Sequence, residues 1–189
     1  APTETDWPVH KVYAHMLGAD LGFTAVIRYA LKNHRAGVWT PDSATDEDFL
    51  RMIGLSEEEY ETLLRGPYPD LLAYHRDFHA RIVAEFSAIT AAELDLPAAF
   101  WEDERFPIRY RLHRYEAHLR QHTIQVDKTL AAIGLAPSEA RRLIRMLYAA
   151  LAEVNGVLIG AESAFEPELD ALAQTIIVRT EELGQLLRQ

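Results

Sequence analysis

Apolar side chains recur at three- and four-residue steps along most of this sequence, which is the period of an α-helix with one buried face. Stretches rich in proline, glycine, serine and aspartate interrupt the repeat and are typical of helix ends and connections. No segment shows the strict alternation of apolar and polar residues that is typical of a β-strand. The pattern therefore predicts an all-α fold.

Four or five long helices, each of about 20 residues and about 30 Å in length, follow from these breaks. The predicted helices begin at Trp7-Pro8, Asp70, Pro107, Pro137-Ser138 and Pro167, and they end near Arg35, Thr90, Gly134, Asn155-Gly156 and Leu186. Short connections favour antiparallel neighbours, so we expect a helical bundle with a site between helices. Because neither a repeat nor a linker divides the chain, residues 1–189 are predicted to form one domain.

Short additional helices are predicted between the first two long ones. Thr45 with Asp48, and Ser56 with Glu59, are capping boxes, in which a hydroxyl and a carboxylate cap the same helix start. A later segment, residues 91–105, is acidic and aromatic, and its Phe100 and Trp101 are expected to anchor the packing of the connection.

Composition limits the classes of function. The formal net charge of −10 argues against binding to nucleic acid, because phosphate contacts need clustered Lys and Arg. The sequence shows no run of about 18 apolar residues and no signal peptide, which predicts a cytoplasmic protein without a membrane partner. It has no cysteine, so a metal ion would be held by His, Asp or Glu.

Two histidines four residues apart, His118 and His122, are the first candidates for such a site. Residues at this spacing lie on one side of a helix, one turn apart, so both imidazoles can face a common point. The pair falls along one edge of the apolar stripe of its helix, in a row with Arg111, Gln125 and Thr129. Spacing alone leaves two interpretations open, a metal or substrate contact and a pair of histidines at the edge of the core.

A rival pair with the same spacing is His75 and His79. His75 falls near the middle of its apolar stripe, and no third ligand is evident nearby in the sequence. We therefore favour buried histidines with local hydrogen-bond partners at these two positions.

Two sequence motifs together resemble the DinB-like family. Residues 7–20, WPVHKVYAHMLGAD, are similar to that family's first motif, in which a Trp leads into a helix with an Ala-His pair. Residues 118–125, HLRQHTIQ, are similar to its second motif, two histidines followed by a glutamine. The resemblance implies an antiparallel four-helix bundle that binds a divalent metal through three histidines, here His15, His118 and His122. Members usually have a helix before the first motif. In this chain, the C-terminal helix or a partner chain would take the place of that helix.

The same resemblance implies a class of reaction. Characterised relatives carry out transfer or isomerisation with a low-molecular-weight thiol as cofactor. Three imidazoles leave a coordination position open, and Zn²⁺ and Ni²⁺ both suit nitrogen ligands. We therefore expect a metal-dependent thiol transferase that acts on a small electrophilic molecule, although the sequence assigns no catalytic residue. Arg111, Tyr115 and Gln125 are the candidate cofactor contacts, and a solvated surface arginine is the alternative for Arg111.

Two other classes of function stay open. One is a non-enzymatic bundle that binds a metal or ligand in a stress response, as a homodimer. An acidic or nucleophilic residue near the open metal position would favour the enzyme, and a closed apolar pocket would favour the binder. The other class is a helical interaction protein without a metal, in which the three histidines would lie far apart or be buried separately.

Overall fold

The computed structural model describes residues 7–38, 44–99, 105–159 and 166–186, and it confirms the all-α prediction. The helices of this part of the chain are α1 (Val9–Arg35), α2 (Asp46–Ile53), α3 (Glu57–Arg65), α4 (Tyr68–Phe86), α5 (Ile108–Ala132), α6 (Glu139–Leu158) and α7 (Glu166–Leu186). A single 3₁₀ turn, η1 (Glu93–Asp95), lies between α4 and α5 among the described residues.

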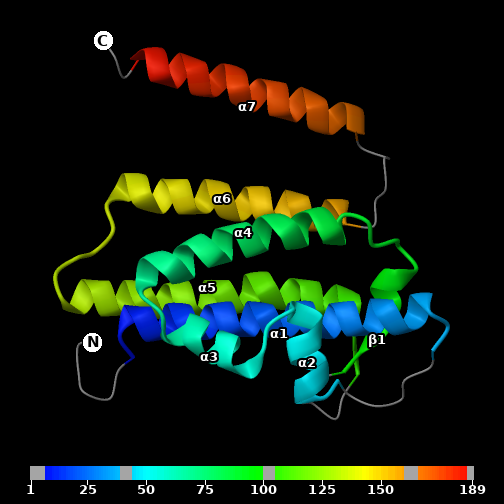
Figure 1. Ribbon diagram of the computed structural model, residues 1–189. Coiled ribbons are helices and arrows are strands. Elements are labelled where there is room, and N and C mark those ends of the chain that lie inside the picture. Colours follow the sequence, from blue (N-terminus) through cyan, green and yellow to red (C-terminus); the bar gives the residue numbers. More distant parts are fainter. Residues whose placement is uncertain (1–6, 39–43, 100–104, 160–165, 187–189) are drawn as a thin grey trace.

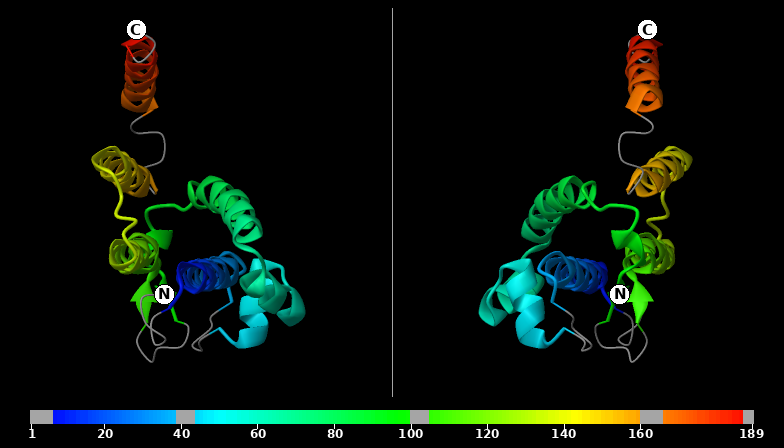
Figure 2. Two further views of the ribbon diagram at one scale, coloured as in Figure 1. Left: turned by 90° about the vertical axis from the view of Figure 1, so that its left-hand side faces the viewer. Right: turned by 90° about the vertical axis from the view of Figure 1, so that its right-hand side faces the viewer.

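Four of the long helices form the bundle. Seen along the helices, α1, α4, α5 and α6 stand at four corners, and α7 lies beyond α6, away from the others (Figures 1 and 2). Because the short helices α2 and α3 carry the chain back along the bundle, α4 runs in the same direction as α1 (Figure 1). Helix α5 runs opposite to both, so α1 and α5 are antiparallel neighbours.

Helix α1 supplies most of the core. Its residues Leu17, Leu21 and Ile27 are completely buried, as are Leu71 at the start of α4 and Ile108 at the start of α5. The predicted apolar stripe of α4 faces this core through the buried side chains Leu71, Phe78, Ile82 and Phe86. The seam between α1, α4 and α5 is thus the well-packed part of the molecule.

The predicted helix ends are close to the observed ones. Both capping boxes are confirmed, at Thr45 before α2 and at Ser56 before α3. Gly134, with a φ of 76°, follows the last turn of α5 in the left-handed conformation that glycine adopts most easily. Helix α6 differs from the prediction, since it continues past Asn155-Gly156 to Leu158. Phe100 and Trp101 lie outside the described residues.

A short two-stranded ladder was not expected from the sequence. Strand β1 (Pro97–Ala98) pairs antiparallel with β2 (Phe106–Pro107), just before α5 begins. Two residues are too few to show an alternating pattern, which is why the pattern of the sequence does not reveal these strands. The ladder places the start of α5 beside the connection that follows α4.

The outer helices carry many exposed apolar side chains. On α6, Leu143, Met146, Leu147 and Tyr148 are 57–70% exposed, and on α7 Ile176 and Ile177 are about half exposed. No helix in the described parts of the chain is both long and apolar enough to cross a membrane. These outward faces of α6 and α7 are not covered by another helix in the described parts of the chain.

Candidate metal centre

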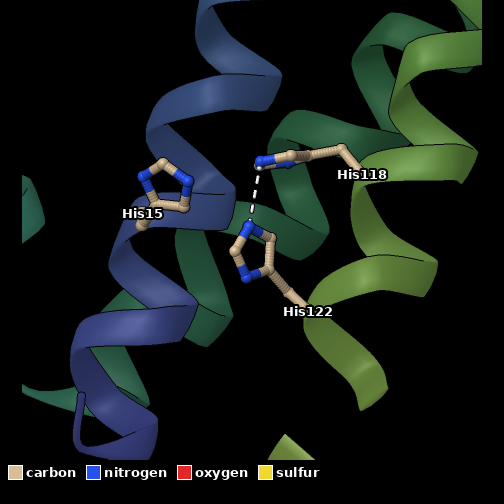
Figure 3. Close-up of side chains that lie close together, drawn as sticks. All are labelled: His15, His118 and His122. Atoms are coloured by element: carbon tan, nitrogen blue, oxygen red, sulfur yellow. Dashed lines mark hydrogen bonds between the residues drawn. The ribbon is translucent and has the colours of Figure 1, made fainter. Parts of the chain in front are cut away.

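Three histidines from two helices meet at the seam between α1 and α5. His15 comes from α1, and His118 and His122 come from consecutive turns of α5, with their rings directed toward a common point (Figure 3). One nitrogen of each ring lies within 4.8 Å of a nitrogen of the other two. Among the described residues, this is the one group of three or more His, Asp or Glu side chains with that geometry.

The position of the histidine row on α5 differs from the prediction. The sequence places His118 and His122 at the edge of an apolar stripe, but the buried face of α5 consists of Ile108, Arg111, His118, His122 and Thr129. Leu119, which belongs to the apolar stripe by its spacing, is 43% exposed. Helix α5 therefore turns its polar row toward α1, and the apolar stripe faces α6 and solvent in its C-terminal half.

The three rings differ in burial. His118 and His122 are each only 8% exposed, whereas His15 is exposed. Trp7 meets the His15 ring edge-on at 5.3 Å between ring centres, and Phe23 meets the His118 ring at 6.0 Å. Aromatic rings thus flank the group, and its His15 side is open to solvent.

Gln125 sets the tautomer of His122. Its side-chain oxygen lies 2.8 Å from Nδ1 of His122, and an amide oxygen only accepts, so Nδ1–H is the donor. The lone pair of His122 is consequently on Nε2, which faces Nε2 of His118 at 3.0 Å (Figure 3). Metal-binding histidines usually have such a partner for the second ring nitrogen, which orients the ring.

The environment favours neutral imidazoles. Burial, His122, His15 and the charge of Arg114 lower the pKa of His118 to about 4, and burial together with His122 lowers the pKa of His15. Nδ1 of His118 is buried without a hydrogen-bond partner in the described structure. Neutral rings are the form that binds a metal ion, so little proton release would accompany binding at these two positions.

The donor set fits a divalent metal ion. Nitrogen ligands about 2.0–2.1 Å from a tetrahedral ion lie about 3.3 Å from one another, close to the observed 3.0 Å between His118 and His122. The third nitrogen, from the exposed His15, lies within 4.8 Å of the other two. Three nitrogens without a thiolate suit Zn²⁺ or Ni²⁺ and leave a coordination position open.

Comparison with known families finds one match, which covers the residues of this site. The model of the DinB superfamily matches residues 1–126, which is two thirds of the 189-residue chain. The protein belongs to the DinB superfamily. The match contains α1 with His15 and the part of α5 that carries His118 and His122. A search of curated proteins and a search of solved structures both find no match.

Two of the predicted cofactor contacts make internal contacts in this DinB-superfamily protein. Arg111 is 1% exposed, and its Nε and Nη2 donate to the carbonyl oxygen of Ala98 in β1, at 3.1 and 2.9 Å. The expected alternative of a solvated arginine is therefore wrong, because the side chain crosses to the strand beside α5. The Tyr115 hydroxyl lies 2.5 Å from Oγ1 of Thr24, and burial raises its pKa well above the usual value.

The rival histidines lie elsewhere in the bundle. Nε2 of His75 is 3.2 Å from a carboxylate oxygen of Asp20, and its Nδ1 is 2.8 Å from the Tyr13 hydroxyl. Asp20 itself is buried. His79 is exposed and outside the three-histidine group, so the prediction of a buried histidine is wrong at this position. Tyr13 and Asp20 are seven residues apart on one face of α1, but His75 comes from α4, so spacing within a helix does not indicate this network.

Proposed function

We propose that His15, His118 and His122 bind one divalent ion, Zn²⁺ or Ni²⁺, and that the protein is a metal-dependent transferase of a low-molecular-weight thiol. The observation that carries this proposal is the convergence of three ring nitrogens within 4.8 Å, open to solvent on the His15 side. A small thiol and a small electrophile can both approach from that side. The order of the two motifs and the superfamily match add support for the metal part of the proposal.

Each residue has a defined task in this proposal. His118 and His122 are one turn apart on α5 and are held by packing against α1, while Gln125 orients the ring of His122. His15 comes from the other helix and closes the third side of the site. A bound divalent ion supplies positive charge that lowers the pKa of a coordinated thiol. Because Arg111 and Tyr115 hold the backbone of Ala98 and the side chain of Thr24, we assign them to positioning of α5.

A non-enzymatic metal- or ligand-binding bundle is the second candidate. The observation that favours it is that no carboxylate joins the three histidines among the described residues, since Asp20 pairs with His75 instead. An enzyme at this site would therefore depend on a nucleophile supplied by the thiol. The third class, an interaction protein without a metal, requires separate histidines, and the structure brings them together.

The transferase is tested with metal-free and metal-loaded protein. The full chain is stripped with a chelator, reloaded with Zn²⁺ or Ni²⁺, and mixed with a small thiol and a chromogenic electrophile such as 1-chloro-2,4-dinitrobenzene. Thioether formation above the uncatalysed rate in the loaded protein, lost in His118→Ala and retained in His79→Ala, supports the proposal. Equal rates in the metal-free protein would refute it, and metal binding without turnover of any thiol would favour the binder.

A further inference from the structure

Two cationic side chains flank the histidines, each through an aromatic ring. The Nζ atom of Lys11 lies 4.6 Å from the centre of the Trp7 ring, which in turn contacts His15. The guanidinium carbon of Arg114 lies 5.8 Å from the centre of the Phe23 ring, which contacts His118. The same arrangement, cation on aromatic ring beside a histidine, thus occurs on both helices of the site.

The helix geometry places the two cations on different sides of the histidine group. Lys11 precedes His15 by one turn in α1, and Arg114 precedes His118 by one turn in α5. Helices α1 and α5 are antiparallel (Figure 1). One turn before the histidine therefore points toward one end of the seam on α1 and toward the other end on α5. The three histidines consequently lie between Lys11 and Arg114 along the length of the bundle.

Neither cation forms an ion pair with an acidic side chain in the described parts of the chain. Other arginines of α5 are paired: Arg109 binds Asp95 at 3.0 Å, and Arg120 binds Glu116 and Glu153. Arg114 instead rests on an aromatic ring, which leaves its hydrogen-bond donors available to a ligand. The two side chains thus give the surface beside the histidines a positive charge, although the chain as a whole has a net charge of −10.

The charge of the site decides what it attracts. Three neutral imidazoles contribute no negative charge to balance a divalent ion, and no carboxylate joins them in the described structure. The ion, Arg114 and Lys11 therefore add to one positive region around the open coordination position. Such a region raises the local concentration of anions and speeds their binding.

We propose that the thiol bound at the histidine site carries an anionic group, a carboxylate being the best fit, which Arg114 binds and Lys11 attracts. This inference rests on the proposed metal-dependent thiol function. The planar guanidinium presents paired N–H donors that match a carboxylate, whereas the ammonium of Lys11 acts as a point charge. The specificity of the site thus comes from the residues one turn before the metal ligands.

The test uses Co²⁺ as a spectroscopic probe in the full-length chain. Cobalt-loaded protein is titrated at low ionic strength with 3-mercaptopropionate, which carries a carboxylate, and with the neutral 2-mercaptoethanol, and the change in the cobalt absorption bands reports binding. We expect the parent to bind the anionic thiol about tenfold more tightly. Arg114→Gln should remove most of this preference and Lys11→Gln part of it, while Arg109→Gln keeps it.

The outcomes separate this inference from the function on which it rests. Unchanged cobalt bands and unchanged affinity for 2-mercaptoethanol in Arg114→Gln show that the variant is folded. Equal affinity of the parent for both thiols, or a preference that survives in Arg114→Gln and Lys11→Gln, overturns this inference alone. A parent that gives no cobalt bands, or that binds neither thiol, overturns the proposed function and this inference together.

Discussion

At the scale of single residues, the hydrogen bond between Gln125 and His122 is the contact that orients one ring of the candidate site. It holds the proton on Nδ1 and directs Nε2 toward His118. The contact comes from the residue three positions after His122, within one helix, so it forms whenever α5 forms. The second motif of the family resemblance includes this glutamine, and the structure indicates a physical reason for its presence.

Replacing Gln125 should weaken metal binding without unfolding the protein. We expect Gln125→Leu to lower the affinity for Zn²⁺ by about 10–100-fold, because the His122 ring loses the acceptor that orients it. Competition with a chromogenic chelator measures this affinity. Gln121→Leu, an exposed change on the same helix, serves as the control. Equal affinities in Gln125→Leu and Gln121→Leu would show that Gln125 does not position the ligand.

A second residue-scale prediction concerns Glu93 and the acid stability of the fold. Hydrogen bonds from Arg35 and Thr90 lower the pKa of Glu93 from 4.5 to about 2. A depressed folded-state pKa stabilises the protein above pH 4.5, and this contribution is lost as the pH falls from 4.5 to 2. Glu93→Gln should therefore lower the free energy of unfolding at neutral pH by about 1 kcal/mol, since Arg35 is half exposed.

Urea unfolding at a series of pH values measures this effect. The parent should lose stability relative to Glu93→Gln as the solution is acidified through this range, so that the two curves converge. Glu61→Gln, which removes the carboxylate of an exposed pair with Arg65, is the control and should change little. A constant difference between the parent and Glu93→Gln at all pH values would contradict the assignment.

At the scale of elements, Arg111 joins α5 to β1. Its guanidinium is buried, and two of its nitrogens donate to the carbonyl of Ala98, thirteen residues earlier in the chain. Arg111→Leu should lower the free energy of unfolding by about 1–3 kcal/mol, because this buried carbonyl loses its donors. Urea unfolding followed by circular dichroism measures the loss.

The matched control is Arg109→Leu, two residues earlier on the same helix. Its partner Asp95 is largely exposed, so this change should cost at most about 1 kcal/mol. If Arg111→Leu were no more destabilising than Arg109→Leu, the assignment of Arg111 to the positioning of α5 would be wrong.

Contacts between residues close in sequence can be predicted from spacing, whereas contacts between distant segments cannot. Helices, capping boxes and the His118–His122 pair depend on residues three or four apart, so spacing is enough to find them. Arg111 with Ala98, and Asp20 with His75, join segments that approach only after folding. The meeting of His15 with the α5 pair is also of this second kind, and only the family resemblance indicated it in advance. The buried face of α5 was only partly predicted, because its polar row packs on α1 together with the apolar residues of its N-terminal half.

At the scale of the whole molecule, the exposed apolar surface of α6 and α7 indicates an interface with another chain. Leu147 on α6 is 62% exposed and Ile176 on α7 is 48% exposed, in an arm that stands away from the core (Figure 2). Large exposed apolar patches are uncommon on monomers. A second copy related by a two-fold axis would cover both helices of each chain at once, so we propose a homodimer, as the family resemblance also suggests.

A charged residue in this surface should separate the dimer. We expect Leu147→Glu to shift the protein from dimer to monomer in sedimentation velocity, because a carboxylate cannot be buried in an apolar interface without a partner. Val38→Glu, at a position 51% exposed beyond the end of α1, should remain dimeric. A monomeric parent, or a dimer that tolerates Leu147→Glu, would exclude association through α6.

The most direct test of the central claim is elemental analysis of the full chain purified without a histidine tag. We predict about one equivalent of Zn or Ni per chain in the parent, loss of that metal in His118→Ala, and full retention in His79→Ala, which alters the rival pair. No metal in the parent after incubation with Zn²⁺ and Ni²⁺, or the same metal content in His118→Ala, would contradict the three-histidine site.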